Sequence, residues 1–382
     1  MIIIEISSRS EKKVEQMLFV KKVIQTLLLF CLFLSILEVG SRALLGIKSI
    51  DRIIRQGHGS AIRRWNWIDR HQPGMPPVVP YDRYDPTKGW ELKPNISYRN
   101  TWGEGQVFHS NSRGIRGEVE HSYAKPKGKL RILCLGDSFT FGEGVSDGET
   151  YPYYLQQMLP NVEVINMGVH GYGHDQTLIY LKEEGVKYRP DIVILGFLAQ
   201  DNDRNMMTFS DYAKPRFKLA KGKLKLCNVP VPSPDMTLRQ EPWRLKFLDL
   251  LSLLQEHISN RIGAYAKERE ALTNAILKEM LATTRGAGAM PIFAYLDHVR
   301  GEESNSGVIG DEKSFLDKCG DLSVKCVFLR RSVYSARLLG IRIKEKGHFD
   351  PKTNELVALG IKEYLLKNGL PDRKLQGDGL IF

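Results

Sequence analysis

The chain has 382 residues and a formal net charge of +11, with 42% hydrophobic and 26% charged residues. These fractions are those of an ordinary folded protein, and they exclude general disorder and a protein with many membrane spans. The excess of Lys and Arg would suit an anionic partner, but no recognisable nucleic-acid motif accompanies it. We interpret the positive charge as a basic segment beside a membrane and a solvated loop, and we expect no nucleic-acid partner.

The first feature along the chain is an apolar stretch over residues 23–39, VIQTLLLFCLFLSILEV, which is near the lower limit for crossing a bilayer. We predict a basic N-terminal segment over 1–22, a transmembrane anchor over 23–40 and a loosely packed juxtamembrane linker over 41–80. A cleaved signal peptide is the alternative, because small residues follow Val39 at a possible cleavage point. Basic residues flank both ends of the stretch, so the positive-inside rule does not fix its orientation.

A small β-rich segment is predicted over 81–128, where turn residues separate short strand-like runs. After it, short apolar runs alternate with amphipathic stretches. Strands are predicted over residues 131–135, 162–165, 191–197, 290–296 and 324–329. Helices are predicted over residues 150–159, 175–186, 244–285 and 355–366.

Strands that alternate with helices and read as continuous apolar runs indicate a parallel sheet covered on both faces. The sequence therefore predicts an α/β, doubly wound, flavodoxin-like domain of about five strands over 129–370, followed by a tail over 371–382. An insertion over 206–242 follows a strand at its carboxyl end, where it can shape substrate specificity.

The cysteines offer one candidate pair and no metal site. Cys319 and Cys326 are close enough in sequence to close a short disulfide loop if the domain is extracytoplasmic. No Cys/His cluster has the spacing of zinc ligands, so we expect no metal.

The first predicted strand of the α/β domain ends in Gly136-Asp137-Ser138, directly before a helix. This position exposes the Ser138 hydroxyl at the edge of the sheet and places backbone N–H groups beside a developing oxyanion. An ordinary strand-to-helix turn capped by Asp or Ser is the alternative. The glycines that follow do not have dinucleotide-binding spacing, and Thr140 stands where the nucleophile elbow of α/β-hydrolases requires glycine.

Three further segments carry polar residues to strand ends or to the start of a helix. Residues 166–174 and 196–205 follow the second and third strands at the same sheet edge, where a glycine turn and an Asn or Gln amide can bind an oxyanion. We interpret His170 and His174 in the first of these segments as surface-loop residues. His348 precedes the last helix and is the candidate general base for Ser138.

These residues resemble the SGNH, or GDSL-type, hydrolase superfamily, and especially its bacterial members with an N-terminal membrane segment. The resemblance runs from the GW and NSRGIRG motifs to the final helix. It implies that Ser138 is the nucleophile, that His348 is its base, and that the backbone N–H groups of Ser138 and Gly171 bind the oxyanion.

Two positions depart from the family pattern. The family's third-block Asn falls within QDNDRN, where either Asn202 or Gln200 can supply the amide. The family places an Asp three residues before the histidine, whereas this chain has Glu345. Glu345 can still orient the imidazole, and a Ser–His dyad with a backbone acceptor is the alternative.

The resemblance implies a serine esterase that cleaves short acyl esters, often on carbohydrates, with no cofactor and with an extracytoplasmic domain held by a single membrane helix. Its expected partners are an acylated small molecule or glycan and the membrane. One alternative is transfer of the acyl group to a glycan hydroxyl, and another is a non-catalytic, membrane-tethered glycan-binding or assembly protein. A nucleotide-binding flavodoxin-like domain is disfavoured, because the sequence lacks a phosphate-cradling glycine loop.

Overall fold

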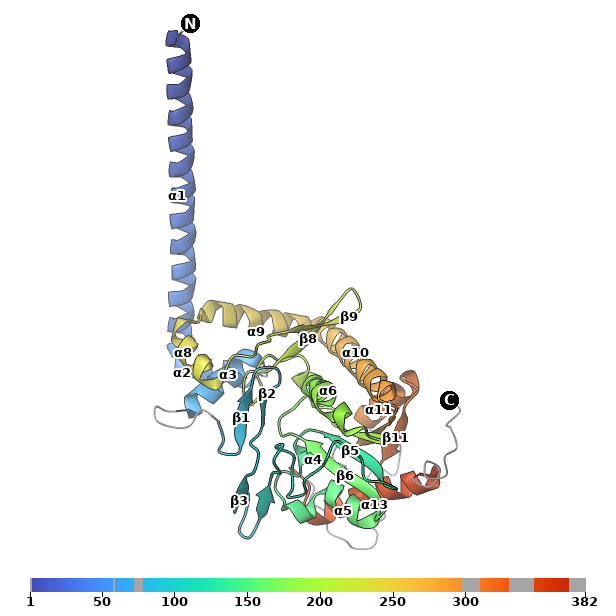
Figure 1. Cartoon of the computed structure of the whole chain (residues 1–382). Helices are drawn as coiled ribbons and strands as arrows, with labels where there is room; N and C mark the ends of the chain where they lie inside the picture. Colours follow the sequence, from blue (N-terminus) through green and yellow to red (C-terminus); the bar gives the residue numbers. More distant parts are fainter. Residues whose placement is uncertain (1, 58, 72–77, 297–309, 330–346, 371–382) are drawn as a thin grey trace.

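The computed structural model describes residues 2–57, 59–71, 78–296, 310–329 and 347–370. The long helix α1 (Ile2–Gly46) projects from a body that contains the other elements (Figure 1). Within the described residues, one helical segment, Gln16–Gly46, is long and apolar enough to cross a membrane, and the body buries none of its most apolar window.

A five-stranded parallel sheet forms the centre of the body. Its strands are β5 (Leu130–Gly136), β6 (Val162–Gly168), β7 (Ile192–Phe197), β10 (Met290–Tyr295) and β11 (Lys325–Phe328). The order across the sheet is β6-β5-β7-β10-β11, and every neighbouring pair is parallel. Numbered along the sheet's own strands this is the 2-1-3-4-5 order of a flavodoxin-like fold, so the predicted fold class is confirmed.

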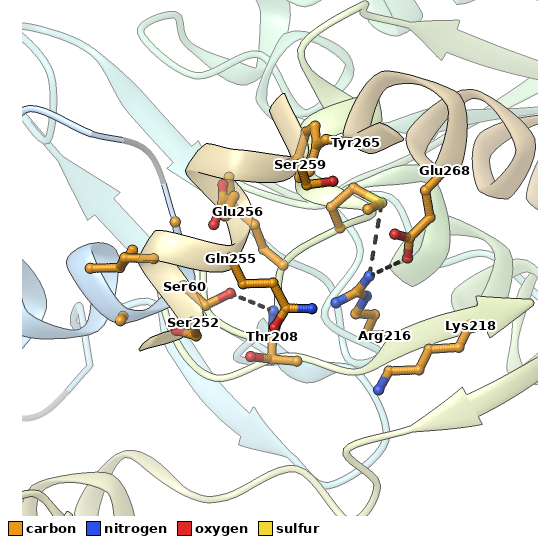
Figure 2. A pocket seen from close by; sticks show the side chains of 15 residues that line it. Ser60, Thr208, Arg216, Lys218, Ser252, Gln255, Glu256, Ser259, Tyr265 and Glu268 are labelled. Atoms are coloured by element: carbon orange, nitrogen blue, oxygen red, sulfur yellow. Dashed lines mark hydrogen bonds and ion pairs between the residues drawn. The ribbon is translucent and has the colours of Figure 1, made fainter. Parts of the chain in front are cut away.

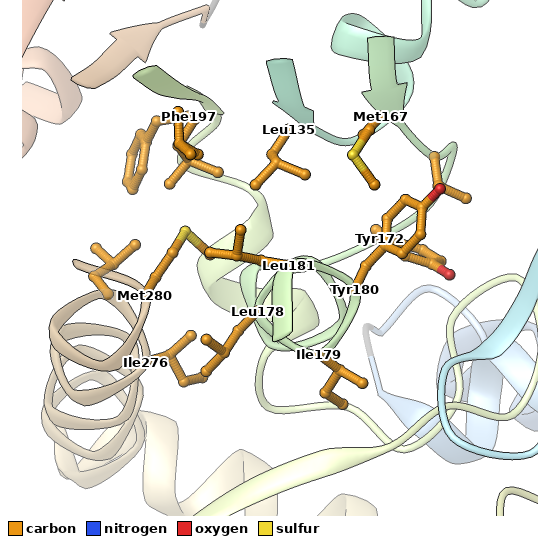
Figure 3. Close-up of a cluster of buried hydrophobic side chains, with 14 of the residues drawn as sticks. Leu135, Met167, Tyr172, Leu178, Ile179, Tyr180, Leu181, Phe197, Ile276 and Met280 are labelled. Carbon is orange, nitrogen blue, oxygen red and sulfur yellow. The ribbon is translucent and has the colours of Figure 1, made fainter. Parts of the chain in front are cut away.

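Both faces of the sheet are covered by helices, because alternate residues of each strand point to opposite sides. On β5, Leu133 and Leu135 belong to the hydrophobic cluster beneath α6 (His174–Glu183) and α10 (Ala264–Gly286). Figure 3 shows this cluster, with Leu181 of α6 between that helix and the sheet, and Leu178 of α6 beside Ile276 of α10.

The opposite face carries a second cluster. Ile132 and Cys134 of β5 pack there with α5 (Tyr151–Met158) and α13 (Pro351–Lys367). The two clusters explain why the sheet strands read as continuous apolar runs rather than as an alternating pattern.

One predicted helix is wrong in its extent. The stretch 244–285 forms two helices, α9 (Lys246–Arg261) and α10, rather than one. The break is at Gly263, whose φ of +71° is left-handed and ends the helical path between them. Beyond α10 lies α11 (Gly310–Asp321), and the predicted disulfide joins its Cys319 to Cys326 of β11.

The segment before the sheet is built from short hairpins. These are β1 (Asp82–Asp85) with β2 (Gly89–Leu92), and β3 (Ser97–Arg99) with β4 (Val107–His109). The segment 206–242 contains a third hairpin, β8 (Arg216–Ala220) with β9 (Lys223–Cys227), and then α8 (Pro234–Gln240) and a short 3-10 turn.

The expectation of loose packing over 41–80 is wrong for the part of this range that forms α3. The range contains α2 (Lys48–Ile54) and α3 (Ser60–Arg70), and α3 buries Trp65 and Trp67. The buried Arg64 pairs with Glu241, 2.9 Å away, and with Asp249. An aromatic and charged face of α3 therefore fixes the linker to the segment around α9, which the local composition of the linker did not indicate.

Candidate active site

Ser138 lies where β5 ends and the short helix α4 (Ser138–Phe141) begins. The Asp137 carboxylate caps α4 by accepting a hydrogen bond of 3.0 Å from the backbone N–H of Phe139. Gly136 allows the sharp turn, because a Cβ atom there would lie 2.3 Å from Thr140 Oγ1. The turn thus places the Ser138 hydroxyl at the carboxyl edge of the sheet.

His348 lies beside this serine although 210 residues separate the two in sequence. Its Nε2 atom is 2.9 Å from Ser138 Oγ. The His348 ring also contacts the Phe139 ring, with 5.0 Å between their centroids. Two residues later, Asp350 caps α13 by accepting a 2.7 Å hydrogen bond from the N–H of Thr353, so the start of this helix positions the histidine.

The predicted orienting residue Glu345 lies outside the described residues. A different carboxylate, that of Glu143, approaches His348 with 3.7 Å between Oε2 and Nε2. It comes from the loop after α4 and stands beside the same nitrogen that contacts Ser138.

The candidate oxyanion groups follow β6 and β7. Gly171 has a φ of +71°, and a Cβ atom there would lie 1.9 Å from an Asp211 carboxylate oxygen and 3.2 Å from the Trp90 ring. Only glycine fits this turn. Among the described residues, the backbone N–H groups of Ser138 and Gly171 donate no hydrogen bond to the protein, which leaves both donors for a ligand.

Gln200 and Asn202 differ in their surroundings. Gln200 precedes α7 (Asp201–Arg204) and is exposed. Asn202 is within α7, and its side-chain oxygen is buried with no hydrogen-bond partner among the described residues. Both residues follow β7, and their surroundings do not decide which of them supplies the oxyanion amide.

Arg204, which the sequence did not single out, connects three of the candidate segments. Its Nη1 donates hydrogen bonds to Asp137 at 2.9 Å, to Asp201 at 2.6 Å and to the Tyr172 carbonyl at 3.1 Å. Burial raises the pKa of Asp201 well above its usual range, and the negative charge of Asp137 adds to this effect. One guanidinium thus joins the loops that follow β5, β6 and β7.

The NSRGIRG motif also supports this edge of the sheet. Arg116 is buried, and its guanidinium donates to Asp147 at 2.6 Å and to the Val145 carbonyl at 2.7 Å. Gln106 donates to the Gly144 carbonyl at 2.6 Å. Together these bonds hold the loop that carries Glu143 against His348.

The interpretation of His170 and His174 as surface-loop residues is wrong, because both are buried. His170 Nε2 lies 2.8 Å from Asp82 Oδ1. Burial alone would lower the pKa of His170, but the charge and hydrogen bond of Asp82 outweigh burial and raise that pKa to about 9.

The pKa of His174 is shifted in the opposite direction to that of His170. Burial lowers the pKa of His174 to about 3, helped by the positive charges of Arg204 and Lys318. Its ring stacks on Phe197 with 4.8 Å between centroids. The local sequence does not show whether a histidine is buried, because the partners of His170 and His174, Asp82 and Phe197, come from other segments.

A separate cavity of about 470 Å³ lies between α9, the start of α3 and β8 (Figure 2). Its lining is mostly polar and includes Ser252, Glu256 and Arg216. None of the candidate catalytic residues lines it. No group of three or more His, Cys, Asp or Glu side chains within the described ranges is arranged to hold a metal ion.

No protein-family model matches the chain, and no curated protein matches it. Solved structures do. The chain is similar to a lipolytic protein of the G-D-S-L family from Veillonella parvula, with 12% identity over 62% of this chain and 99% of that one and a TM-score of 0.38.

Two esterase structures give similar values. The psychrotrophic esterase from Pseudoalteromonas has 14% identity over 64% of this chain and 100% of that one, with a TM-score of 0.37. An acetyl-xylooligosaccharide esterase from Geobacillus has 12% identity over 62% and 95%, also with a TM-score of 0.37. Similarity at this level carries no information on activity.

Proposed function

We propose that the chain is a serine hydrolase of ester bonds, with Ser138 as nucleophile and His348 as general base. The contact of 2.9 Å between Ser138 Oγ and His348 Nε2 is the observation that carries the proposal. Ser138 is buried at a helix N-terminus, and its hydroxyl is within hydrogen-bond distance of the His348 imidazole. Proton transfer from the hydroxyl to a general base requires this geometry.

The chemistry follows from these positions. His348 takes the proton of the Ser138 hydroxyl as its oxygen attacks the ester carbonyl, and then donates that proton to the departing alcohol. The oxyanion is held by the N–H groups of Ser138 and Gly171 and by the amide of Asn202 or Gln200. Water activated by His348 then releases the acyl group and restores the serine.

We extend the proposal to short acyl esters on a carbohydrate or cell-envelope glycan, which the motif resemblance implies. Two residues orient the site in this proposal. Glu345 supports His348 from the segment that precedes it, and Arg204 positions Asp137. No step requires a metal or cofactor.

We further propose that α1 anchors the chain in a membrane and that the catalytic domain is extracytoplasmic. The apolar and exposed Gln16–Gly46 segment supports the anchor. The disulfide between Cys319 and Cys326 supports an oxidising compartment, because such bonds are rare in the cytosol.

The test of the hydrolase is hydrolysis of p-nitrophenyl acetate and labelling by a fluorophosphonate probe, with the full chain in detergent. We expect Ser138→Ala and His348→Ala to lower kcat/KM at least 1000-fold, since residues of a nucleophile–base pair act as a unit. Ser252→Ala and His257→Ala, both in α9, are matched controls and should retain activity.

The outcomes separate the alternatives. Labelling of Ser138 without hydrolysis of any ester would favour acyl transfer to a glycan hydroxyl. A folded chain with neither labelling nor hydrolysis would overturn the proposal in favour of a non-catalytic glycan-binding protein.

A further inference from the structure

Helix α9 carries an exposed apolar face. Its large apolar side chains recur at helical spacing and point to solvent: Leu248, Leu251, Leu254, Ile258 and, just past the helix, Ile262. Spacings of three and four residues place these side chains on one stripe of the helix. Trp243, just before α9, is 85% exposed.

The opposite face of α9 lies against the body and combines polar side chains with the half-buried Leu253. Asp249 is buried there, in contact with Arg64 and with the Trp65 indole N–H at 3.2 Å. Ser252 and Glu256 point into the cavity of Figure 2. A surface helix of a water-soluble protein buries its apolar stripe against the core, whereas the stripe of α9 faces outward.

Helix α9 begins at the end of the apolar part of α1. The Glu38 carboxylate accepts a hydrogen bond of 3.2 Å from the Phe247 N–H. Arg42 donates to the carbonyls of Pro242 and Arg244, at 3.2 and 3.1 Å. Figure 1 shows α9 extending sideways from this end of α1, rather than continuing along it.

These contacts determine the height of α9 relative to a bilayer. If α1 crosses the membrane over 23–40, then Glu38 and Arg42 lie at its boundary, and the start of α9 lies there too. A helix at this height that runs sideways from the anchor meets the headgroup layer, and an amphipathic helix there buries its apolar face among the acyl chains.

We propose that α9 is an interfacial membrane helix, whose face of Trp243, Leu248, Leu251, Leu254, Ile258 and Ile262 lies in the bilayer that α1 spans. The inference rests on the proposed anchor. The flanking side chains fit this surface: tryptophan is enriched at membrane interfaces, and Arg42, Arg244 and Lys246 favour anionic headgroups. Lipid is favoured over a second copy of the chain, because the exposed apolar surface of α1 continues into α9.

An interfacial α9 would fix the body against the membrane at two points instead of one. Helix α13, which follows His348, lies on the side of the body away from α1 (Figure 1). The candidate nucleophile Ser138 would therefore be held at a constant distance from the headgroups.

The experiment uses the full chain in nanodiscs of phosphatidylcholine and phosphatidylglycerol, with a fluorophore on single cysteines and nitroxide-labelled lipids as quencher. The background carries Cys31→Ser and Cys227→Ser, while Cys134 is fully buried. Leu251→Cys and Ile258→Cys report on the apolar face. Asn260→Cys is the matched control on α9, and Glu363→Cys on α13 is the distant one.

We expect quenching at 251 and 258 to be at least three times that at 260 and 363. Quenching at 251 and 258 equal to that at 363 would overturn the proposal and leave the anchor intact, provided that a separate variant, which keeps Cys31 and carries only Cys227→Ser, is quenched at its labelled Cys31. Labels at 251 and 258 that are shielded from water but unquenched would overturn it in favour of a protein partner or a second copy. An unquenched Cys31 would reject the anchor, and the interfacial helix with it.

Discussion

At the scale of single residues, the site depends on pairs that are far apart in sequence. His348 reaches Ser138 across 210 residues, and Arg204 reaches Asp137 across 67. The histidine has a chemical role that a motif can suggest. The arginine acts through the carboxylates that it holds, and its position became evident only when the loops after β5, β6 and β7 met.

Arg204 is therefore expected to be a positioning residue for Ser138. Arg204→Lys keeps the charge but removes the guanidinium nitrogen Nη1, which donates to both Asp137 and Asp201. We expect the rate of Ser138 phosphonylation to fall at least tenfold, while the far-UV circular dichroism spectrum is unchanged. Lys187→Arg on the surface is the control for the chemistry of the change. An Arg204→Lys variant that reacts at the wild-type rate would contradict this role.

The buried pair of His170 and Asp82 makes stability depend on pH. The pKa of His170 is about 9 in the folded state and 6.5 as its ordinary value, so the folded state binds the proton more tightly. The stabilisation is complete below pH 6.5 and is lost as the pH rises to about 9. The difference between these pKa values corresponds to about 3 kcal/mol.

We expect the difference in Tm between the wild type and His170→Gln to shrink as the pH rises from 6.5 to 9. Thermal unfolding at half-unit pH intervals measures it, and the comparison cancels the other groups that titrate in this range. A difference that stays constant with pH would show that His170 is neutral in the folded state.

At the scale of elements, α3 is the least expected part of the fold. It lies in a segment whose composition indicated a spacer, but Trp67 is buried and packs edge-on against Phe209 and Tyr212, with centroids 5.7 and 6.3 Å away. These aromatic partners come from the segment 206–242. Helix α3 and the segment 206–242 thus bury each other's aromatic side chains.

Trp67→Ala should lower the free energy of unfolding by about 3–5 kcal/mol, because it removes a large buried side chain and leaves a cavity. The matched change Trp243→Ala removes an exposed indole and should cost less than about 0.5 kcal/mol. Denaturant unfolding of the full chain in detergent compares the two. Equal effects would show that α3 does not pack on the core.

At the scale of the whole molecule, the proposed anchor and the disulfide indicate the same cellular compartment. The exposed apolar Gln16–Gly46 segment supports the proposed membrane anchor, and the bond between Cys319 and Cys326 supports the proposed oxidising compartment. If both hold, the body is on the extracytoplasmic side and the basic residues 1–22 are on the cytoplasmic side.

We expect the chain in cells to resist carbonate extraction and its Cys319–Cys326 pair to resist alkylation until a reductant is added. Replacing both cysteines by serine should cost about 2 kcal/mol, the loop-closure entropy of a loop this short. Alkylation of both thiols without reductant would place the domain in a reducing compartment. Release by carbonate, with a mature N-terminus near residue 41, would favour a cleaved signal peptide.

The sequence by itself determined the fold class, the strands of the central sheet, and the candidate serine and histidine, and it offered Cys319 and Cys326 as a candidate pair that the structure then joined. These features have local signals: buried parallel strands are continuous apolar runs, and Gly136-Asp137-Ser138 stands between a strand and a helix. Tertiary structure decided the rest. It determined the burial of His170 and His174, the hydrogen bonds of Arg204, the packing of α3 and the outward apolar face of α9. Each of these depends on partners from distant segments. Neither periodicity nor composition along a chain shows which distant segments meet.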